Sequence, residues 1–409
     1  MEQIEKIFII QPILDDCWRK SHDECVALIE SAGGAYCGSS YQVIKEINSA
    51  TFIGSGKLQE INNNLTGLGN ITILFNGNLS PSQTLNISEA LDDRKVIDRT
   101  TLILDIFALN AMTSEGKIQV ELAQLNYLYP RLKGKGASLS RLGGGIGSRG
   151  PGETRLETDR RYIRYRIKFL EKRLHETEVR RHLQNNRRNK TGIKTIALVG
   201  YTNTGKSSLM NALTGANVLE KNALFATLDP TARTVEIDGI QFLLIDTVGF
   251  IKNLPHDLIE AFKSTLESAV NCDLALFVAD ASDDYNMQFE TTYITLSKLG
   301  FNKPYIKVLN KCDLIDNTDM LPADCVCISV KNNYGIDLLK ENIATSFADR
   351  FTKLKLFVPY SLMNEYSNLA YAVHAINLNF TNDGMEVSCT IDNKYLPLFK
   401  KFQIYNINY

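Results

Sequence analysis

The sequence lacks any long apolar run. None of its 409 residues lies in a stretch approaching the roughly 18 consecutive apolar residues that a membrane-spanning helix needs, so stable membrane insertion is not expected. The amino terminus carries Glu2 and Glu5 before the short run Ile7–Ile10. A secretory signal would have a basic start and a small-residue cleavage site there, so this run predicts a buried strand. We expect a cytoplasmic protein, with partial membrane association as the alternative.

Metal-binding cysteine pairs are also missing. The chain has 8 cysteines but no CxxC pair, and Cys325 and Cys327 have no second pair nearby. Zinc sites built from cysteine need such pairs, so reduced thiols in the protein core are the expected state. The 5 histidines are scattered and form no visible catalytic cluster.

Net charge is nearly absent, at -1, which taken alone gives no sign of a nucleic-acid partner. The charge is unevenly distributed, however. Residues 131–194 contain 19 Lys and Arg against 6 Asp and Glu, a net of +13, which leaves -14 on the remainder. A basic insert in an acidic chain indicates an anionic partner, although a solvated basic helix is the alternative.

Elements of alternating type predict an α/β protein. In residues 1–110, apolar runs predict strands and amphipathic stretches predict helices, together a small unit with a mostly parallel sheet. The strand candidates are Ile7–Ile10, Thr51–Ile53, Ile71–Phe75 and Thr101–Ile106, and the helix candidates are Glu24–Ala32 and Pro81–Leu91. Later strand candidates are Thr195–Val199, Phe242–Ile245, Leu274–Ala279, Tyr305–Leu309, Cys325–Ile328, Lys355–Val358 and Met385–Ile391.

A helical hairpin is predicted between these parts. Apolar residues recur at helical spacing over 113–132, where Pro130 is expected to end or kink the helix. Eight glycines within Gly134–Gly152 predict a loop, and a second, basic helix is expected from about Arg155. The polar stretch Asn185–Gly192 is interpreted as a linker.

A phosphate-binding loop is the strongest motif. Residues 200–207, GYTNTGKS, match G-x-x-x-x-G-K-[ST] between an apolar run and the helix-like stretch Ser208–Leu213. Lys206 is expected to bridge the β- and γ-phosphates, and Ser207 to bind Mg²⁺. The sequence DTVG at 246–249 ends a predicted strand, where Asp246 would hold Mg²⁺ through water and the Gly249 N–H would meet the γ-phosphate.

Guanine specificity is indicated by NKCD at 310–313. The Asp313 carboxylate can accept hydrogen bonds from guanine N1–H and the 2-amino group, which adenine does not offer. Asn310 would contact the other edge of the base, Lys311 would cover its plane, and the turn after Ser329 would reach O6. Between Lys206 and Asp246, Thr227 is the favoured sensor of γ-phosphate and Mg²⁺, and Thr231 is the second choice.

Motifs in this order resemble the translation-factor-like class of P-loop GTPases. The expected metal ligands are Ser207, Thr227 and Asp246, and the expected catalytic residues are Asn203, Lys206, Thr227 and Gly249. The expected GTP-binding residues are Gly200, Tyr201, Thr202, Asn203, Thr204, Gly205, Lys206, Ser207, Ser208, Phe225, Ala226, Thr227, Leu228, Asp229, Asp246, Thr247, Val248, Gly249, Asn310, Lys311, Asp313, Ser329, Val330 and Lys331.

Longer motifs outside this core resemble the HflX family. They are LSPSQT at 79–84, DRT at 98–100, LDIF at 104–107, QVELAQL at 119–125, RLGGGIGSRGPGET at 141–154, LFATLDPT at 224–231 and DTVGF at 246–250. The resemblance implies a monomeric GTPase that binds the large (50S) ribosomal subunit and splits stalled or idle 70S ribosomes under stress. It also implies that the hairpin reaches into ribosomal RNA. The candidate RNA contacts are Arg141, Arg149, Arg155, Arg160, Arg161 and Arg164.

The expected architecture therefore has four parts. They are an α/β subdomain at 1–112, a helical hairpin at 113–190 with a glycine-rich basic loop at 134–152, a P-loop GTPase domain at 193–350 and a small α+β tail at 351–409. The family is also associated with ATP binding in its amino-terminal region, but no second phosphate loop is present there.

Two positions in the GTPase motifs bear on hydrolysis. Phe250 stands where many GTPases have a water-orienting Gln, so unaided hydrolysis should be slow and a partner should complete the site. Asn203 resembles the residue of potassium-stimulated GTPases, and the alternative is an Asn that only stabilises the turn. Two rival functions stay open: a GTPase of ribosome assembly or RNA modification, and an RNA-binding protein with little turnover.

Overall fold

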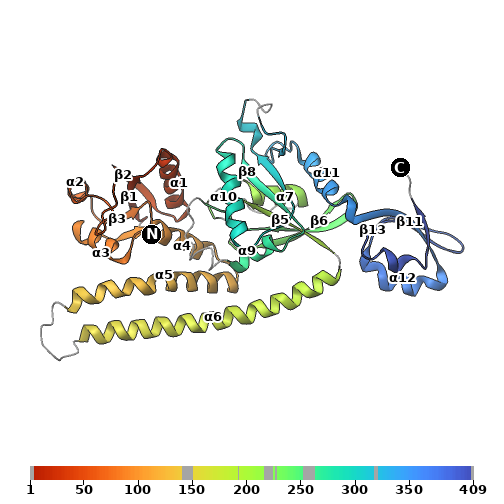
Figure 1. Cartoon of the computed structure of the whole chain (residues 1–409), viewed down its shortest axis with the longest axis horizontal. Coiled ribbons are helices and arrows are strands. Elements are labelled where there is room, and N and C mark those ends of the chain that lie inside the picture. The colour runs from red at the N-terminus through yellow and green to blue at the C-terminus, as the bar shows by residue number, and fades with distance from the viewer. Residues whose placement is uncertain are drawn as a thin grey trace. The chain divides into compact units, whose positions relative to one another are not determined.

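The computed structural model describes residues 4–140, 151–191, 193–215, 224–225, 228–251, 263–316 and 321–406. The chain forms two compact units (Figure 1). The first comprises residues 1–177, 221–229 and 253–263, and the second comprises residues 178–220, 230–252 and 264–409. No helix in the described residues is both long and apolar enough to cross a membrane.

A four-stranded parallel sheet, in the order β2-β1-β3-β4, forms the centre of the first unit. Its strands and helices are β1 (Lys6–Ile13), α1 (Trp18–Ser31), β2 (Ala35–Val43), α2 (Ser55–Leu65), β3 (Ile71–Phe75), α3 (Pro81–Ala90), β4 (Val96–Asp98) and α4 (Arg99–Asn110). Strand β3 is buried along its whole length, as expected where helices cover both faces of a parallel sheet. The predicted small α/β unit is therefore confirmed.

Two strand predictions in this unit were wrong. Residues 51–53 form no strand, and the run Thr101–Ile106 lies in helix α4. Helix α4 is buried on several sides, so its apolar residues do not show the one-sided helical period that distinguishes a helix from a strand. Its start is set by Asp98, whose carboxylate accepts a hydrogen bond from the Thr101 N–H at 3.0 Å.

Two long helices follow, α5 (Ser114–Ser140) and α6 (Pro151–Thr191). They run antiparallel side by side, because Arg166 of α6 pairs with Glu121 at 2.6 Å while Arg164 bonds Tyr129 at 2.6 Å (Figure 1). The predicted pair of antiparallel helices is confirmed. At 41 residues, α6 is about 60 Å long at a rise of ~1.5 Å per residue.

The predicted ends of these helices differ from the observed ones. Helix α5 does not end at Pro130 but continues through it; Pro130 is exposed, so water can bond the carbonyl that proline leaves without a donor. It also includes the first glycines of the expected loop, since extending an existing helix through a glycine costs only about 1 kcal/mol. The interpreted linker is helical to Thr191, because no proline or glycine interrupts residues 153–191.

The second unit has a six-stranded sheet in the order β10-β9-β8-β5-β7-β6, parallel except for β6. Its strands are β5 (Lys194–Gly200), β6 (Thr231–Ile237), β7 (Ile240–Asp246), β8 (Leu274–Asp280), β9 (Tyr305–Asn310) and β10 (Cys325–Cys327). Its helices are α7 (Lys206–Thr214), α9 (Lys263–Val270), α10 (Tyr285–Lys298), the short 3₁₀ helix η1 (Cys312–Leu314) and α11 (Ile336–Ser346). The strand candidates from Thr195 to Ile328 overlap these strands.

Helices cover both faces of this sheet. Ile196 and Leu198 of β5 pack with α7 and α11, while Ala197 and Val199 pack with α9 and α10. This alternation follows from the two-residue period of a strand. The five parallel strands end at one edge of the sheet, where the loops that follow them form the candidate site.

A four-stranded antiparallel sheet, β12-β13-β11-β14, ends the chain. Its elements are η3 (Ala348–Arg350), β11 (Phe351–Pro359), η4 (Tyr360–Leu362), α12 (Met363–Leu369), η5 (Ala370–Ala372), β12 (Val373–Phe380), β13 (Gly384–Asp392), η6 (Leu396–Phe399) and β14 (Gln403–Asn406). Ion pairs Lys194–Asp392 at 2.8 Å and Lys353–Asp238 at 2.7 Å link this sheet to the nucleotide-site half of the unit.

Candidate nucleotide-binding site

The phosphate-binding loop connects β5 to α7. Gly205 precedes α7 with φ +85°, and a Cβ there would come within 2.3 Å of the Asn310 Nδ2. Only glycine accepts both the left-handed backbone and this close approach. Residues 200–205 therefore turn tightly enough for the amino end of α7 to face a phosphate.

Lys206 lies inside this loop, and 7% of it is exposed. Its Nζ donates hydrogen bonds to the carbonyl oxygens of Tyr201 at 2.6 Å and Gly200 at 3.2 Å. Burial lowers the pKa of Lys206 to about 8, although the Asp246 carboxylate opposes this shift. A phosphate next to Nζ would favour the charged lysine, so the site is electrostatically suited to an anion.

Ser207 and Asp246 supply oxygen ligands for a cation. The Ser207 Oγ donates to the Asp246 Oδ2 at 2.7 Å, and Asp246 is buried at the end of β7. A hydroxyl and a carboxylate suit Mg²⁺, which prefers oxygen ligands and retains waters. In the described ranges, no group of three or more His, Cys, Asp or Glu gathers around a metal position.

Asn310 connects two loops of the site. Its Nδ2 donates to the Thr204 carbonyl at 2.9 Å, and its Oδ1 accepts from the Val330 N–H at 3.2 Å. The phosphate-binding loop and the turn after β10 are thereby held together. Asn310 thus positions both loops, in addition to the base contact that the sequence predicts.

Asp313 has a hydrogen-bond partner that sequence reasoning missed. The Ser329 Oγ donates to its Oδ1 at 2.6 Å, and this bond lowers the pKa of the carboxyl group. The group is consequently ionised and has its other oxygen available as an acceptor. Sequence reasoning had assigned only backbone contacts to the Ser329 turn.

Lys311 also has a partner that the motifs did not indicate. Its Nζ pairs with the Asp280 carboxylate at 2.6 Å, and its backbone is left-handed with φ +63°. Asp280 ends β8, so its position at the carboxyl end of a parallel strand was the available signal. The ion pair orients the lysine stem that is expected to cover the base.

Phe250 does not provide a polar group. Its side chain is buried among Ala197, Val199 and Leu266, while its backbone exchanges hydrogen bonds with Gly200 and Thr202 at 3.0 and 2.7 Å. This residue fixes the distance between the DxxG segment and the phosphate-binding loop. The phenyl ring of Phe250 has no atom that could orient a water molecule.

The remaining predicted nucleotide contacts fall into two sets. Tyr201, Thr202, Thr204, Thr247 and Val248 are buried around the loop, whereas Asn203 and Lys331 are exposed. Ser208 lies in α7, and Gly249 lies in the loop that follows β7. Phe225, Leu228 and Asp229 belong to the first unit, and Ala226 and Thr227 lie outside the described residues.

Thr231, the second choice for the sensor, begins β6, where its hydroxyl meets the Met210 sulfur at 3.5 Å. This contact places Thr231 against α7 within the second unit.

The arginine candidates for RNA are only partly described. Arg160 and Arg164 lie over the ring of Tyr129, at 5.6 and 5.7 Å from its centroid, and Arg161 is exposed. Arg155 is in α6, but its side chain is not among the described parts of the structure. Arg141 and Arg149 lie outside the described residues.

The parallel sheet, the phosphate-binding loop and the ordered DxxG, NKxD and S-x-K segments define a P-loop GTPase. Family models agree along the chain. They are described as GTP-binding GTPase N-terminal at 19–108, GTP-binding GTPase Middle Region at 110–188 and 50S ribosome-binding GTPase at 195–311. The class is thus that of GTP-binding, ribosome-associated GTPases that hydrolyse GTP.

Relatives specify the family within this class. The chain is 43% identical to GTPase HflX of Caldanaerobacter subterraneus, covering 96% of this chain and 98% of that protein. It is 43% identical to GTPase HflX of Lacrimispora saccharolytica over 92% of this chain and 89% of that protein. This chain belongs to the HflX family of GTPases.

A solved structure is also similar. A GTP-binding protein from the archaeon Sulfolobus solfataricus, in complex with GDP, is 26% identical over 85% of this chain and 99% of that chain, with a TM-score of 0.45.

Proposed function

We propose that this GTPase docks on the large (50S) ribosomal subunit through its basic hairpin and splits stalled or idle 70S ribosomes under stress. The observation that carries the proposal is the combination, in one chain, of a GTPase site with a long antiparallel helix pair and a +13 segment. Such a segment suits contacts with RNA phosphates, while the acidic remainder disfavours indiscriminate binding. We also propose the four-part division at 1–112, 113–190, 193–350 and 351–409.

The geometry of the nucleotide site supports the residue roles that we propose. Lys206 bridges the β- and γ-phosphates, and Asp313 selects guanine. Mg²⁺ neutralises charge developing on the phosphates when it is bound. Ser207 and Thr227 are assigned to bind it directly and Asp246 through water, an assignment supported by the 2.7 Å contact between Ser207 and Asp246.

Aromatic side chains on the hairpin support an RNA-binding face. Tyr162 and Tyr165 of α6 are exposed at 67% and 70%, beside the exposed Arg161 and Arg164. Exposed rings interleaved with arginines can stack on bases while the guanidinium groups contact phosphates.

Sedimentation of 70S ribosomes in a sucrose gradient tests the proposal. With GTP or a non-hydrolysable analogue, the wild-type protein is expected to convert 70S particles into subunits, and Lys206→Ala is not. Large subunits are also expected to raise GTP turnover by roughly tenfold or more, because they complete the site that Phe250 leaves without a polar group. Arg161→Ala/Arg164→Ala should weaken both effects.

The matched control removes two exposed lysines of the tail, Lys355→Ala/Lys400→Ala, and should retain both effects. Co-migration without dissociation would favour ribosome assembly or RNA modification. GTP turnover that is equal with and without large subunits would contradict the assigned partner, and negligible turnover in both would favour a nucleotide-stabilised RNA-binding protein.

Replacing K⁺ by Na⁺ tests a second cation. Asn203 is exposed in the phosphate-binding loop with φ +59°, so its amide oxygen is available as a ligand. Turnover with large subunits is expected to fall several-fold in Na⁺, and Asn203→Ala should remove the difference between the two salts. Equal rates for the wild type in both salts would leave Asn203 as a turn residue only.

A further inference from the structure

The segment Leu224–Asp229, which stands where switch I is expected, belongs to the first unit. Residues 178–220 and 230–252 belong to the second unit, whereas Leu224, Phe225 and Asp229 contact α1, α4 and the start of α5 in the first unit. The segment therefore leaves the GTPase unit and returns to it within about ten residues.

Asp229 fastens this segment to the start of α5. Its Oδ2 accepts hydrogen bonds from the backbone N–H groups of Met112 and Thr113, both at 2.8 Å, and its Oδ1 accepts from the Thr113 hydroxyl. The Thr113 Oγ1 in turn accepts from the Gly116 N–H at 2.9 Å. A carboxylate is thereby placed against the amino end of α5, where the helix dipole favours negative charge.

The fit around Asp229 is tight. A Cβ at Gly116 would lie 2.3 Å from the Asp229 Oδ1, so the first turn of α5 accepts the carboxylate only because residue 116 has no side chain. This close approach gives Gly116, which the motifs did not single out, a defined role.

A second anchor lies on the other side of Thr227. The Phe225 ring packs edge to face on Phe107 with 4.8 Å between centroids, and the Phe225 carbonyl accepts from Asn110 Nδ2 at 3.0 Å. The Leu224 N–H donates to the Ser31 Oγ at 3.0 Å. Phe225 has φ +57°, a conformation that a bulky residue retains only when its surroundings hold it.

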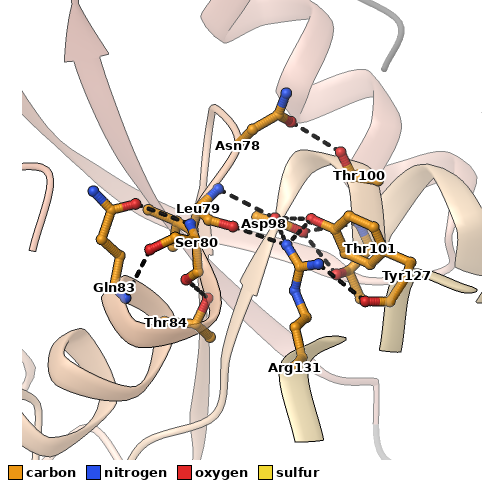
Figure 2. Close-up of polar contacts among 10 residues, drawn as sticks. All are labelled: Asn78, Leu79, Ser80, Gln83, Thr84, Asp98, Thr100, Thr101, Tyr127 and Arg131. Atoms are coloured by element: carbon orange, nitrogen blue, oxygen red, sulfur yellow. Dashed lines mark hydrogen bonds and ion pairs between the residues drawn. The ribbon is translucent and has the colours of Figure 1, made fainter. Parts of the chain in front are cut away.

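The hairpin is in turn clamped to the amino-terminal sheet by Asp98 (Figure 2). Asp98 at the end of β4 accepts from the Tyr127 hydroxyl and from Arg131 at 3.3 Å, and Arg131 also donates to the Leu79 carbonyl at 2.8 Å. Tyr127 and Arg131 belong to α5, about 21 and 27 Å along the helix from Thr113 at a rise of ~1.5 Å per residue.

The second helix is included in the same network. Arg166 of α6 bonds both oxygens of Glu121 in α5, at 2.6 and 2.8 Å. Sheet, α5 and the adjoining part of α6 are thus connected, so a force applied at Asp229 acts on the whole first unit.

We propose that Asp229 is a positioning residue that couples the nucleotide site to the hairpin. In the sequence, Thr227 lies two residues from each anchor, so a movement of Thr227 toward Mg²⁺ and a γ-phosphate would act on both anchors. Its movement carries the anchored segment, and the first unit with its hairpin follows. This inference rests on the proposed function, because it takes Thr227 as the sensor and the large subunit as the hairpin's partner.

The affinity for large subunits measures the coupling. The wild-type protein, saturated with either nucleotide, is expected to bind large subunits about tenfold more tightly with a non-hydrolysable GTP analogue than with GDP. Asp229→Ala should bring this ratio close to one, Asp229→Asn should reduce it, and Asp229→Glu should partly restore it.

Asp284→Ala is the matched control. Asp284 also caps a helix, accepting from the Met287 N–H at 3.1 Å in α10, but it belongs to the second unit, whereas Asp229 belongs to the first. It should keep the wild-type ratio. An unchanged ratio in Asp229→Ala would overturn the coupling. A wild-type protein that binds large subunits equally with either nucleotide, or does not bind them, would overturn the proposed function instead.

Hydrogen exchange tests the anchor without ribosomes. The amides of Met112, Thr113 and Gly116 should be equally protected in the wild type with GDP and with the GTP analogue. Exchange should become roughly tenfold faster in Asp229→Ala. Loss of protection in the wild type with the analogue would show that the hydrogen bonds of Asp229 are broken in that state. It would overturn the proposal that the first unit moves together with the segment Leu224–Asp229.

Discussion

Lys206→Ala is expected to lower GTP turnover by roughly a thousandfold or more, measured as phosphate release with saturating GTP and large subunits. Lys206 is buried within the phosphate-binding loop, and its Nζ is held by the carbonyl oxygens of Gly200 and Tyr201. Alanine removes the positive charge that would face the β- and γ-phosphates. Ser208 and the loop backbone offer no replacement cation.

The variant should remain folded, because burial already disfavours the charged lysine, as its lowered pKa indicates. Its midpoint of thermal unfolding is expected to stay within a few degrees of the wild type. Lys298→Ala, which removes an exposed lysine at the end of α10, is the matched control and should retain turnover. Substantial turnover by folded Lys206→Ala would contradict the assigned role.

Asp313→Asn is expected to lower the affinity for GTP by about a hundredfold or more and to create affinity for xanthosine triphosphate. An amide presents a donor to guanine N1–H and its 2-amino group, where the ionised carboxylate presents acceptors. The Ser329 hydroxyl, which holds the Asp313 Oδ1 at 2.6 Å, can still donate to an asparagine oxygen, so the orientation should persist.

Asp324→Asn provides a control with the same chemical change. Asp324 is likewise an aspartate of lowered pKa, held by Lys307 at 2.7 Å, but it follows no nucleotide motif. The affinities for GTP and xanthosine triphosphate are measured by calorimetry. The preference for GTP should change to a preference for xanthosine triphosphate in Asp313→Asn, and should stay unchanged in Asp324→Asn. Unchanged preference in Asp313→Asn would show that another group reads the base.

The core elements of the second unit could be predicted because short-range patterns specify them. Apolar runs followed by polar motifs at Gly200, Asp246 and Asn310 indicate strands that end at a common edge, and β5, β7 and β9 do so. The hairpin helices were predictable for the same reason. The ends of these helices were not predictable. Pro130 and Gly134 each disfavour a helix at their own position, but whether the helix continues also depends on the neighbouring residues and on solvent.

Buried helices were the other failure. The run Thr101–Ile106 is compatible with a strand or a helix, and only its burial on several sides in α4 distinguishes them. Hydrogen bonds and ion pairs between residues far apart in the sequence could not be predicted either. Ser329 with Asp313 is separated by 16 residues, and Lys311 with Asp280 by 31.

The sequence by itself determined the class of protein, the phosphate-binding loop, the NKxD motif that contains Asp313 and the concentration of positive charge in residues 131–194. These features depend on residue identities at fixed short spacings. Only the tertiary structure decided that Leu224 and Phe225 pack with the amino-terminal unit and that Asp229 accepts a hydrogen bond from Thr113 at the start of α5, 116 residues away in sequence. Such a contact arises from chain topology and from the space left by Gly116, which no local pattern reports.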